Sequence, residues 1–254
     1  MRLQGKLAVV TGGSEGIGLA ICEALAREGA DLVIVGRTVA KLAAAQQQIG
    51  NAARILVSAD LSTEPGIGAV VEEVRQLRRP LDILVNNAAV AHLATFESIT
   101  AEQYNYSVAL NVSAPFFLTQ RLLPHFIQPG ASIINISSYF AGKMIMNRPL
   151  SVYSLSKGAI NSLTKSLAFE LGPRGIRVNA VAPGTVNTPM RKKSVEAMSK
   201  ENQDALQQYV ERSYPLGVIG EPSDFGGIVV FLASDEASWV TGSIFAIDGG
   251  FTAG

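Results

Sequence analysis

The chain has 254 residues, enough for one large α/β domain, and 48% of them are hydrophobic. Basic and acidic side chains number 21 each, and this balance argues against partners such as nucleic acid or an anionic membrane surface. With one cysteine, two histidines and no apolar run of membrane-spanning length, the chain is expected to be a cytoplasmic protein without disulfide bonds, metal ions or transmembrane helices.

Seven apolar runs alternate with helical patterns along the chain. This alternation is typical of a doubly wound, Rossmann-type parallel sheet with helices on both faces. No linker or repeat divides the sequence, so we expect a single domain over residues 1–254. The predicted strands are 7–10, 32–35, 55–57, 83–85, 133–136, 178–181 and 244–247.

A glycine-rich turn follows the first predicted strand. Gly12, Gly16 and Gly18 have the spacing G-x-x-x-G-x-G, and the pattern becomes helical after Gly18. A strand, a glycine turn and a helix start together form an anion site, because backbone N–H groups point at a phosphate and missing Cβ atoms let a pyrophosphate approach. The turn predicts a dinucleotide site, although a glycine triplet alone also occurs in ordinary loops.

The second predicted strand ends at Gly36 and Arg37. In a dinucleotide fold this strand end faces the adenosine ribose, where an acidic residue binds the 2′-hydroxyl of NAD and an arginine accommodates the 2′-phosphate of NADP. Arg37 therefore favours NADP(H) over NAD(H), with a solvated charge at a helix start as the alternative. Glu15 complicates this interpretation, because its charge near the same phosphate would oppose binding.

Polar residues also follow the third and fourth predicted strands. Asp60 is placed either to accept from the exocyclic amine of adenine or to cap the next helix. Asn86 and Asn87, followed by Ala88 and Ala89, indicate a tight junction with backbone close to a ligand. A hydrogen-bonded strand end is the alternative for this pair of amides.

Residues 101–128 are predicted to form one long helix. Asn111 interrupts its apolar centre, and a buried amide without partners costs a few kcal/mol. Asn111 is therefore either a structural residue or the holder of a water in a proton path. His92 and His125 lack the spacing of a metal site or a nucleophile pair, so we expect both to be surface or core residues.

The fifth predicted strand ends in Ser137 and Ser138, at the sheet edge where open α/β sheets carry ligand groups. Tyr153 and Lys157 follow, four residues apart and on one helix face. A phenol with a pKa of about 10 is a poor catalyst near neutral pH. A nearby ammonium lowers that pKa, so the pair suits acid–base chemistry, although a surface helix pair has the same spacing.

The order of these motifs resembles that of the single-domain short-chain dehydrogenase/reductases over nearly the full length of the chain. Two features depart from the family pattern: Ala89 stands where glycine is usual, and the interval from Ser138 to Tyr153 is longer than usual. The longer interval leaves the pocket shape open. The matching residues are Thr11 to Gly18, Asp60, Asn86-Asn87-Ala88-Ala89, Asn111, Ser138, Tyr153, Lys157, Pro183-Gly184-Thr185 and Ile247-Asp248-Gly249-Gly250.

The resemblance implies a role for each catalytic candidate. Tyr153 would be the general acid in ketone reduction and the base in the reverse direction, and Ser138 would bind the substrate oxygen. Lys157 would hold the nicotinamide ribose and lower the tyrosine pKa, and Asn111 would hold a water of the proton relay. The implied cofactor-binding residues are Gly12, Ser14, Glu15, Gly16, Ile17, Gly18, Arg37, Asp60, Leu61, Asn87, Ala88, Ala89, Tyr153, Lys157, Pro183, Gly184, Val186 and Thr188.

The resemblance further implies an NADP(H)-dependent carbonyl reductase or alcohol dehydrogenase for a small-molecule substrate, with a mobile lid at about residues 188–214 and a homotetrameric assembly. Basic side chains in the lid, Arg191 and Lys192 among them, would suit an acidic substrate or carrier protein, unless they simply form a solvated helix face. A 3-oxoacyl-[acyl-carrier-protein] reductase is therefore the alternative enzyme. A non-catalytic dinucleotide-sensing protein is the alternative outside enzymes.

Overall fold

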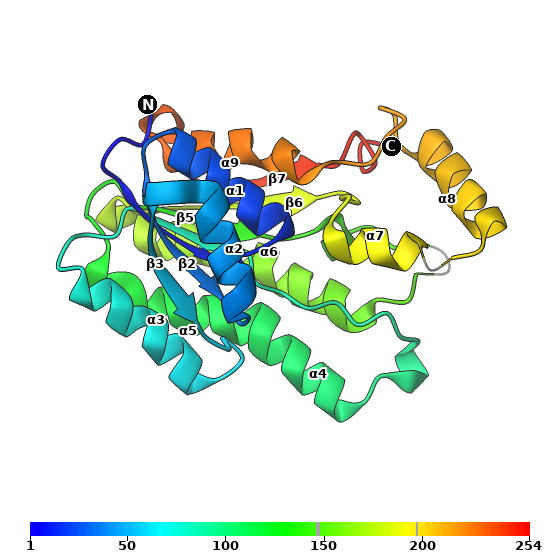
Figure 1. The fold of residues 1–254 in the computed structure, drawn as a ribbon, viewed down its shortest axis with the longest axis horizontal. Coiled ribbons are helices and arrows are strands. Elements are labelled where there is room, and N and C mark those ends of the chain that lie inside the picture. The colour runs from blue at the N-terminus through cyan, green and yellow to red at the C-terminus, as the bar shows by residue number, and fades with distance from the viewer. Residues whose placement is uncertain (146–147, 197) are drawn as a thin grey trace.

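The computed structural model describes residues 1–145, 148–196 and 198–254. Its centre is a parallel sheet of seven strands in the order β3-β2-β1-β4-β5-β6-β7, which confirms the predicted doubly wound fold (Figure 1). The chain runs outward from β1 on one side and from β4 on the other, so the strand order reverses between β1 and β4. The strands are β1 (Leu7–Thr11), β2 (Asp31–Gly36), β3 (Ala53–Ser58), β4 (Ile83–Asn86), β5 (Ser132–Ile136), β6 (Arg177–Pro183) and β7 (Ile244–Ile247).

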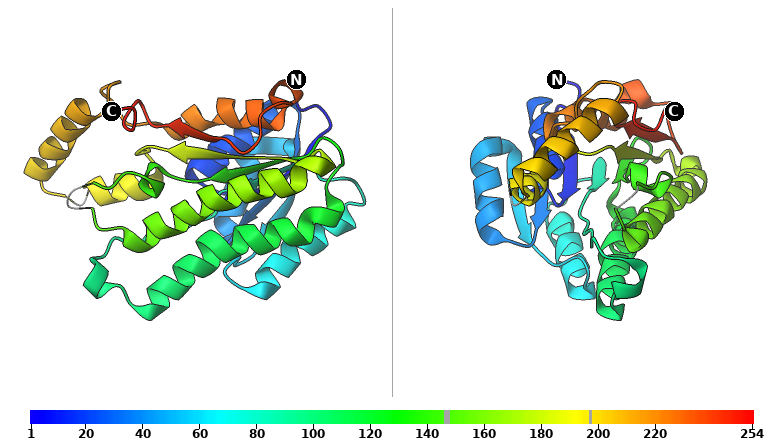
Figure 2. Two further views of the ribbon diagram at one scale, coloured as in Figure 1. Left: turned by 180° about the vertical axis from the view of Figure 1, so that it is seen from behind. Right: turned by 90° about the vertical axis from the view of Figure 1, so that its right-hand side faces the viewer.

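Helices cover both faces of the sheet, and the end-on view shows the resulting layers (Figure 2). All residues of β1, β4 and β5 are buried, as expected for strands of aliphatic residues packed on two sides. On one face, Ile21 and Val229 pack in a common cluster, and on the other, Val70 and Leu118 do so. The helices are α1 (Gly16–Arg27), α2 (Val39–Ile49), α3 (Glu64–Gln76), α4 (Ala101–Val108), α5 (Ala114–Leu122), α6 (Ser151–Leu171), α7 (Pro189–Glu196), α8 (Lys200–Ser213) and α9 (Gly226–Ala233).

The long helix predicted over 101–128 is interrupted and shorter. A π-helical turn, Ala109–Ser113, separates α4 from α5, and a 3₁₀ turn, Leu123–His125, follows α5. Pro124 lies in that 3₁₀ turn, where its lack of a backbone N–H is tolerated, whereas inside an α-helix it would remove a hydrogen bond. The π turn contains Asn111, and such turns often occur at functional sites.

The carboxyl ends of the strands face the segment that contains α7 and α8. Figure 1 shows these two helices at the end of the molecule toward which the arrowheads of β6 and β7 point. Val186 follows β6, Gly220 follows α8, and the two residues form a parallel β-bridge. The bridge joins the beginning and the end of the segment that contains α7 and α8. The loops that follow β1, β2, β4, β5 and β6 therefore gather at one edge of the sheet.

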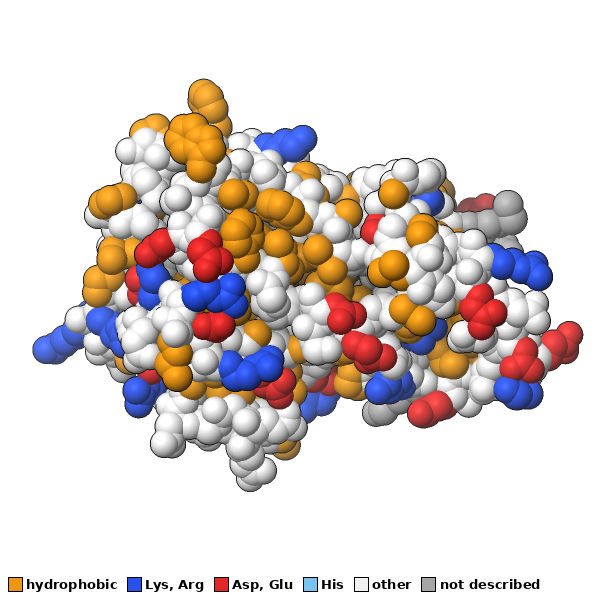
Figure 3. Space-filling view, turned by 90° about the horizontal axis from the view of Figure 1, so that it is seen from above, with side chains coloured by type: hydrophobic (Ala, Val, Ile, Leu, Met, Phe, Trp, Pro, Cys, Tyr) orange, Lys and Arg blue, Asp and Glu red, His pale blue; other side chains and the backbone are white. Residues whose placement is uncertain are grey.

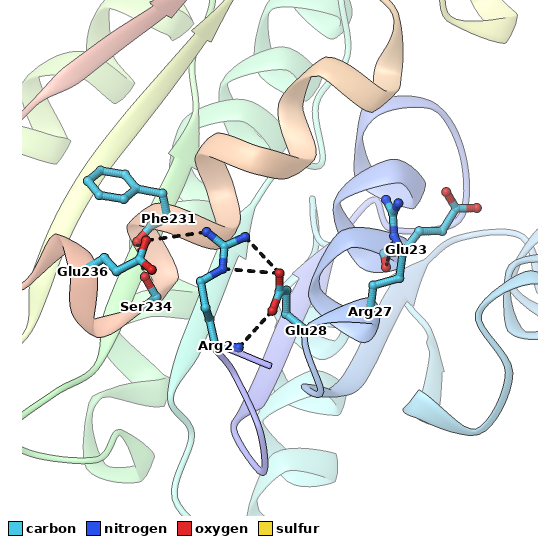
Figure 4. A network of polar contacts seen from close by, with 7 residues as sticks. All are labelled: Arg2, Glu23, Arg27, Glu28, Phe231, Ser234 and Glu236. Atoms are coloured by element: carbon cyan, nitrogen blue, oxygen red, sulfur yellow. Dashed lines mark hydrogen bonds and ion pairs between the residues drawn. The ribbon is translucent and has the colours of Figure 1, made fainter.

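Ion pairs close the opposite edge of the sheet. Arg2 contacts Glu28, which follows α1, at 2.9 Å and Glu236, which follows α9, at 3.5 Å (Figure 4). Exposed pairs of this kind contribute about 1 kcal/mol or less each. They fasten the N-terminal segment at the end of the molecule away from the carboxyl ends of the strands.

Acidic and basic side chains are interspersed on the face shown in Figure 3, in keeping with the zero net charge. Among the residues that the structure describes, no helix combines the length and the apolar character needed to cross a bilayer.

Candidate active site

The glycine turn after β1 is folded tightly against the end of β4. Gly12 has φ +64°, and a Cβ there would lie 2.8 Å from Nδ2 of Asn87. A Cβ on Gly18 would lie 2.1 Å from the carbonyl oxygen of Gly12, so neither glycine can be replaced without moving the turn. Glu15, the N-cap residue of α1, makes no side-chain capping bond, which leaves the first amides of α1 available to an anion.

Thr11 and Asn87 hold this turn in place. The hydroxyl of Thr11 accepts from the backbone N–H groups of Asn87 at 2.9 Å and Ala88 at 3.0 Å. The side-chain amide of Asn87 donates to the carbonyl oxygens of Thr11 at 2.9 Å and Gly12 at 3.1 Å. Both amide protons of Asn87 are therefore used to fasten β4 to the glycine turn, and only its Oδ1 faces other partners.

A cleft opens at the carboxyl ends of β1, β2 and β4, and most of the predicted cofactor residues line it. Those in the lining are Gly12, Ser14, Glu15, Gly16, Ile17, Gly18, Arg37, Leu61, Asn87, Ala88, Ala89 and Thr188. Those outside it are Asp60, Tyr153, Lys157, Pro183, Gly184 and Val186. Gly36, which the sequence analysis placed at the ribose, also lines the cleft. Lining residues that the sequence analysis missed are Val35, Thr38, Lys41, Ala59, Leu110 and Pro189.

The β2 end of the cleft is narrow and charged. A Cβ on Gly36 would lie 3.0 Å from Oγ of Ser14, so this strand end accepts only a small residue. Arg37 follows, and its guanidinium donates to the hydroxyl of Tyr106 on α4. The glycines, the amides of α1 and this cation together fit a nucleotide diphosphate with a charged group on its ribose.

Asp60 follows β3 and bonds within its own loop. Its Oδ1 accepts from the backbone N–H of Ser62 at 2.9 Å and from the Ser62 hydroxyl at 2.7 Å. Thr63 is the N-cap residue of α3, so the alternative that Asp60 caps this helix is wrong. Burial alone would raise the pKa of Asp60, but the bonds from Ser62 and the charge of Arg37 outweigh it and leave that pKa below its usual value.

Ser138, Tyr153 and Lys157 come together where β5 ends against α6. The Ser138 side chain lies close enough to Tyr153 to act on the pKa of its phenol, and its Oγ accepts from the backbone N–H of Phe140 at 3.3 Å. Ser137 instead donates to Oδ1 of Asn161 at 2.6 Å and so faces elsewhere. Lys157 is only 4% exposed, and its Nζ lies 5.6 Å from the centre of the Tyr153 ring. That ammonium donates to the carbonyl oxygen of Ile136 at 2.7 Å.

Burial governs the protonation of Tyr153 and Lys157. It raises the pKa of Tyr153, and the neighbouring Ser138 hydroxyl opposes only part of that rise. It lowers the pKa of Lys157 to about 8. The sequence analysis expected Lys157 to lower the tyrosine pKa, and in this structure the removal of both groups from water has the larger effect and favours their neutral forms.

Asn111 is buried in the π turn with nearly all of its hydrogen-bonding capacity used. Its Oδ1 accepts from the N–H of Val90 at 2.8 Å, and its Nδ2 donates to the carbonyl of Val90 at 2.8 Å and to Oγ of Ser156 at 3.0 Å. Ser156 donates in turn to the carbonyl of Tyr153 at 2.7 Å. The amide thus fastens the loop after β4 to α6, which is the structural alternative for this residue.

Pro183, Gly184 and Val186 shape the backbone beyond β6. A Cβ on Gly184 would lie 2.8 Å from Cα of Asp248, which explains the need for glycine. Val186 is buried, and the hydroxyl of Tyr214, just after α8, donates to Oγ1 of Thr185 at 2.7 Å. The residues after β6 therefore contact the chain just after α8, and they bring Thr188 to the cleft.

An aromatic cluster surrounds the Ser138 loop. Phe251 stacks on Tyr214 with ring centres 4.7 Å apart and meets the edge of Tyr139 at 5.2 Å. Phe140 packs against the ring of Tyr153 at 6.2 Å. The cluster links the C-terminal residues and α8 to the two residues that follow Ser138.

Within the described ranges, no three His, Cys, Asp or Glu side chains lie close enough together to hold a metal ion. Cys22 is buried in α1, and burial raises the pKa of its thiol. The thiolate is the reactive form of cysteine, so this buried, protonated thiol is expected to be unreactive.

A family model described as enoyl-(acyl carrier protein) reductase matches residues 12–252. Galactitol 2-dehydrogenase (L-tagatose-forming) of Cereibacter sphaeroides is 38% identical over 254 residues, which cover 99% of this chain and 96% of that protein. The NADP-dependent (R)-specific alcohol dehydrogenase of Lentilactobacillus kefiri is 37% identical over 262 residues, with 99% and 98% covered.

Among solved structures, the L-sorbose reductase of Gluconobacter frateurii, in complex with NADPH and L-sorbose, superposes with a TM-score of 0.92. The two chains are 33% identical, and the match covers 99% of this chain and 98% of that one. A short-chain dehydrogenase/reductase of Serratia marcescens has a TM-score of 0.89 at 34% identity, with 99% and 100% covered.

Proposed function

Because the chain belongs to the short-chain dehydrogenase/reductase family, we propose that it is an NADP(H)-dependent oxidoreductase that acts on a ketone or the corresponding secondary alcohol. The observation that carries the proposal is the grouping of buried Ser138 and Lys157 with the partly buried Tyr153 at the carboxyl ends of the strands, near a glycine-lined cleft. The nicotinamide cofactor supplies the hydride chemistry.

Each polar group of this site has a defined task in the proposal. The hydroxyls of Ser138 and Tyr153 bind the substrate oxygen, and Tyr153 gives its phenolic proton to that oxygen when a ketone is reduced. In the reverse direction Tyr153 removes the proton of the alcohol. Lys157 holds the nicotinamide ribose, and its charge favours the phenolate.

Asn111 continues the proton path to a water in this proposal. Both protons of its amide are already donated to Val90 and Ser156, so the water must donate to the remaining lone pair of Oδ1 or to a backbone carbonyl of the π turn. The same residue therefore fastens the loop and holds the water.

The proposed preference for NADP(H) rests on Gly36 and Arg37 at the end of β2. Gly36 leaves room beside the ribose, and Arg37 supplies the charge for a 2′-phosphate. Two similar proteins support this preference: the alcohol dehydrogenase of Lentilactobacillus kefiri is NADP-dependent, and the L-sorbose reductase of Gluconobacter frateurii was solved in complex with NADPH. The other predicted cofactor residues, Asp60, Pro183, Gly184 and Val186 included, keep their assignment as part of the proposal.

Turnover by the purified protein tests the function. We expect NADPH oxidation with a panel of ketones and keto sugars, and NADP⁺ reduction with the matching alcohols, at a higher kcat/KM than with NADH or NAD⁺. Tight cofactor binding without turnover of any ketone or alcohol would instead support the dinucleotide sensor.

A 3-oxoacyl-[acyl-carrier-protein] reductase is the second candidate, and it has the acyl carrier protein in common with the matching family model of enoyl-(acyl carrier protein) reductase. The proposed lid gives it little electrostatic support, because residues 189–213 contain five basic and four acidic side chains. Lys200 is moreover paired with Asp204 at 2.7 Å. A much higher kcat/KM for acetoacetyl carrier protein than for acetoacetyl esters of small thiols would establish this candidate.

The proposal includes a single catalytic domain, a substrate lid formed by α7 and α8, and a homotetramer. It also places the protein in the cytoplasm, where a reducing environment suits its one cysteine. The expected substrate is a small molecule, and no metal ion takes part in the proposed reaction.

A further inference from the structure

An ion pair spans the rim of the cleft next to Arg37. Nζ of Lys41 lies 2.8 Å from both carboxylate oxygens of Glu15. Glu15 precedes α1 and Lys41 lies in the first turn of α2, so the pair joins the glycine turn to the helix that follows β2. Both side chains line the cleft together with Arg37, and both are about half exposed, at 51% and 50%.

Helix stability does not explain Lys41. The N-terminus of a helix carries a partial positive charge, so a lysine in the first turn is locally unfavourable. An exposed ion pair also contributes about 1 kcal/mol or less. A lysine at this position is favourable if its ammonium binds an anion that approaches the start of α2.

Glu15 alone would repel such an anion. Its carboxylate stands at the rim of the same cleft as Arg37, and a 2′-phosphate would bring up to two further negative charges there. Lys41 neutralises Glu15 in the structure, and a phosphate binds an ammonium more strongly than one exposed carboxylate does. Lys41 can therefore leave Glu15 and pair with the phosphate at a small cost in free energy.

We propose that Lys41 is a determinant of cofactor choice, with its ammonium held ready by Glu15 and transferred to the 2′-phosphate of NADP(H) beside Arg37. The inference rests on the proposed function, because it assumes that the cleft binds a nicotinamide dinucleotide. NAD(H) has no 2′-phosphate, so Lys41 stays on Glu15 when NAD(H) binds. Cofactor preference then depends on the pair of residues 15 and 41 as well as on Arg37.

Binding measurements on four proteins test the inference: wild type, Lys41→Met, Glu15→Gln and the double variant. The Kd values for NADPH and NADH are measured by titration calorimetry, and 2′-AMP and 5′-AMP serve as probes of the ribose end alone. The matched control is Lys6→Met, which removes a lysine paired with Asp235 at 3.6 Å on the opposite edge of the sheet.

We expect Lys41→Met to raise the Kd for NADPH and for 2′-AMP about tenfold, because a charge-assisted bond to phosphate is lost. The Kd for NADH and for 5′-AMP should rise by less than about twofold. The double variant should bind NADPH about threefold more tightly than Lys41→Met does, since the repulsion by Glu15 is gone. Glu15→Gln alone should strengthen NADPH binding, and Lys6→Met should bind like wild type.

An equal loss for NADPH and NADH in Lys41→Met would mean that the lysine only joins α1 to α2, and the inference would be wrong. An unchanged NADPH affinity would overturn it as well. Wild-type protein that binds neither dinucleotide would overturn the proposed function itself. If wild type binds and turns over NADPH while Lys41→Met shows no selective loss, only the inference fails.

Discussion

At the scale of single residues, burial changes the pKa of both titratable groups of the proposed site. Tyr153 resists ionisation and Lys157 gives up its proton at a lower pH than a solvated lysine does. A neutral phenol beside Ser138 is in the protonation state that the proposed general acid needs.

Replacing Tyr153 by phenylalanine should remove the transferable proton and leave the ring in place. We expect kcat to fall by at least about a hundredfold, the usual contribution of general acid catalysis, and the Kd for NADPH to change by less than about twofold. Steady-state kinetics and calorimetry measure the two effects. Tyr139→Phe is the matched control, because its hydroxyl lies near Thr185 and has no task in the proposed proton transfer. Substantial activity in Tyr153→Phe would show that another group transfers the proton.

Lys157 should make stability depend on pH. Its pKa falls from 10.5 to about 8 on folding, so between these values the unfolded chain holds a proton that the folded protein lacks. Stability therefore rises with pH in this window, by up to about 1.4 kcal/mol per pH unit, and the burial cost is fully present below it.

Urea unfolding of wild type and Lys157→Met measures this effect. Between about pH 7.5 and about pH 9, wild type should gain about 1 kcal/mol relative to the variant. Comparing the two proteins cancels the opposite contribution of Cys22, whose pKa is raised on folding. Lys165→Met, exposed on the same helix, should follow wild type. Parallel pH profiles for wild type and Lys157→Met would contradict the prediction.

At the scale of elements, the π turn between α4 and α5 places Asn111 against the loop that follows β4. Asn111→Leu would leave the partly buried N–H and carbonyl of Val90 and the buried hydroxyl of Ser156 without the Asn111 amide as a partner. We expect a loss of at least about 2 kcal/mol in the free energy of unfolding, measured by chemical denaturation. Asn105→Leu, exposed on α4, should change stability by less than about 0.5 kcal/mol. Equal losses in the free energy of unfolding for the two variants would show that the Asn111 hydrogen bonds do not stabilise the fold to this extent.

The elements that could be predicted are those encoded locally. The strands follow from apolar runs, the glycine turn from its spacing, and the shared face of Tyr153 and Lys157 from helical periodicity. The π turn has no such local signal, since 101–128 has the pattern of an ordinary helix.

Contacts across the chain could not be predicted. Lys41 meets Glu15 across 26 positions, and the amide of Asn87 reaches the glycine turn across more than 70. Sequence alone suggested repulsion by Glu15, because nothing in its neighbourhood reveals a partner on another helix. The only hint of Lys41 was its place four residues after Arg37, in the first turn of α2.

At the scale of the whole molecule, large apolar side chains remain exposed on two neighbouring helices. Phe116 and Phe117 on α5 and Phe169 on α6 are exposed, Phe169 to 87%. Phe116 also lines a groove between these helices together with Leu163 and Leu167. Exposed apolar surface of this kind marks an interface. The proposed homotetramer would cover it.

A charge on this surface should weaken the assembly. We expect Phe169→Asp to shift the mass in light scattering from tetramer toward dimer or monomer at micromolar protein. Phe96→Asp is the control, since Phe96 is exposed to a similar degree, 85%, in the loop before α4. A monomeric wild type, or equal behaviour of the two variants, would contradict the proposed assembly.

Trp239 gives the molecule a built-in optical reporter. It is the only tryptophan in the chain, it is 97% exposed, and it precedes β7 at the edge of the sheet away from the cleft. Its emission should therefore be red-shifted in a separated subunit and move to the blue if a neighbouring copy covers the indole. Nucleotide titrations followed through this fluorophore would be insensitive, whereas dilution series would be informative.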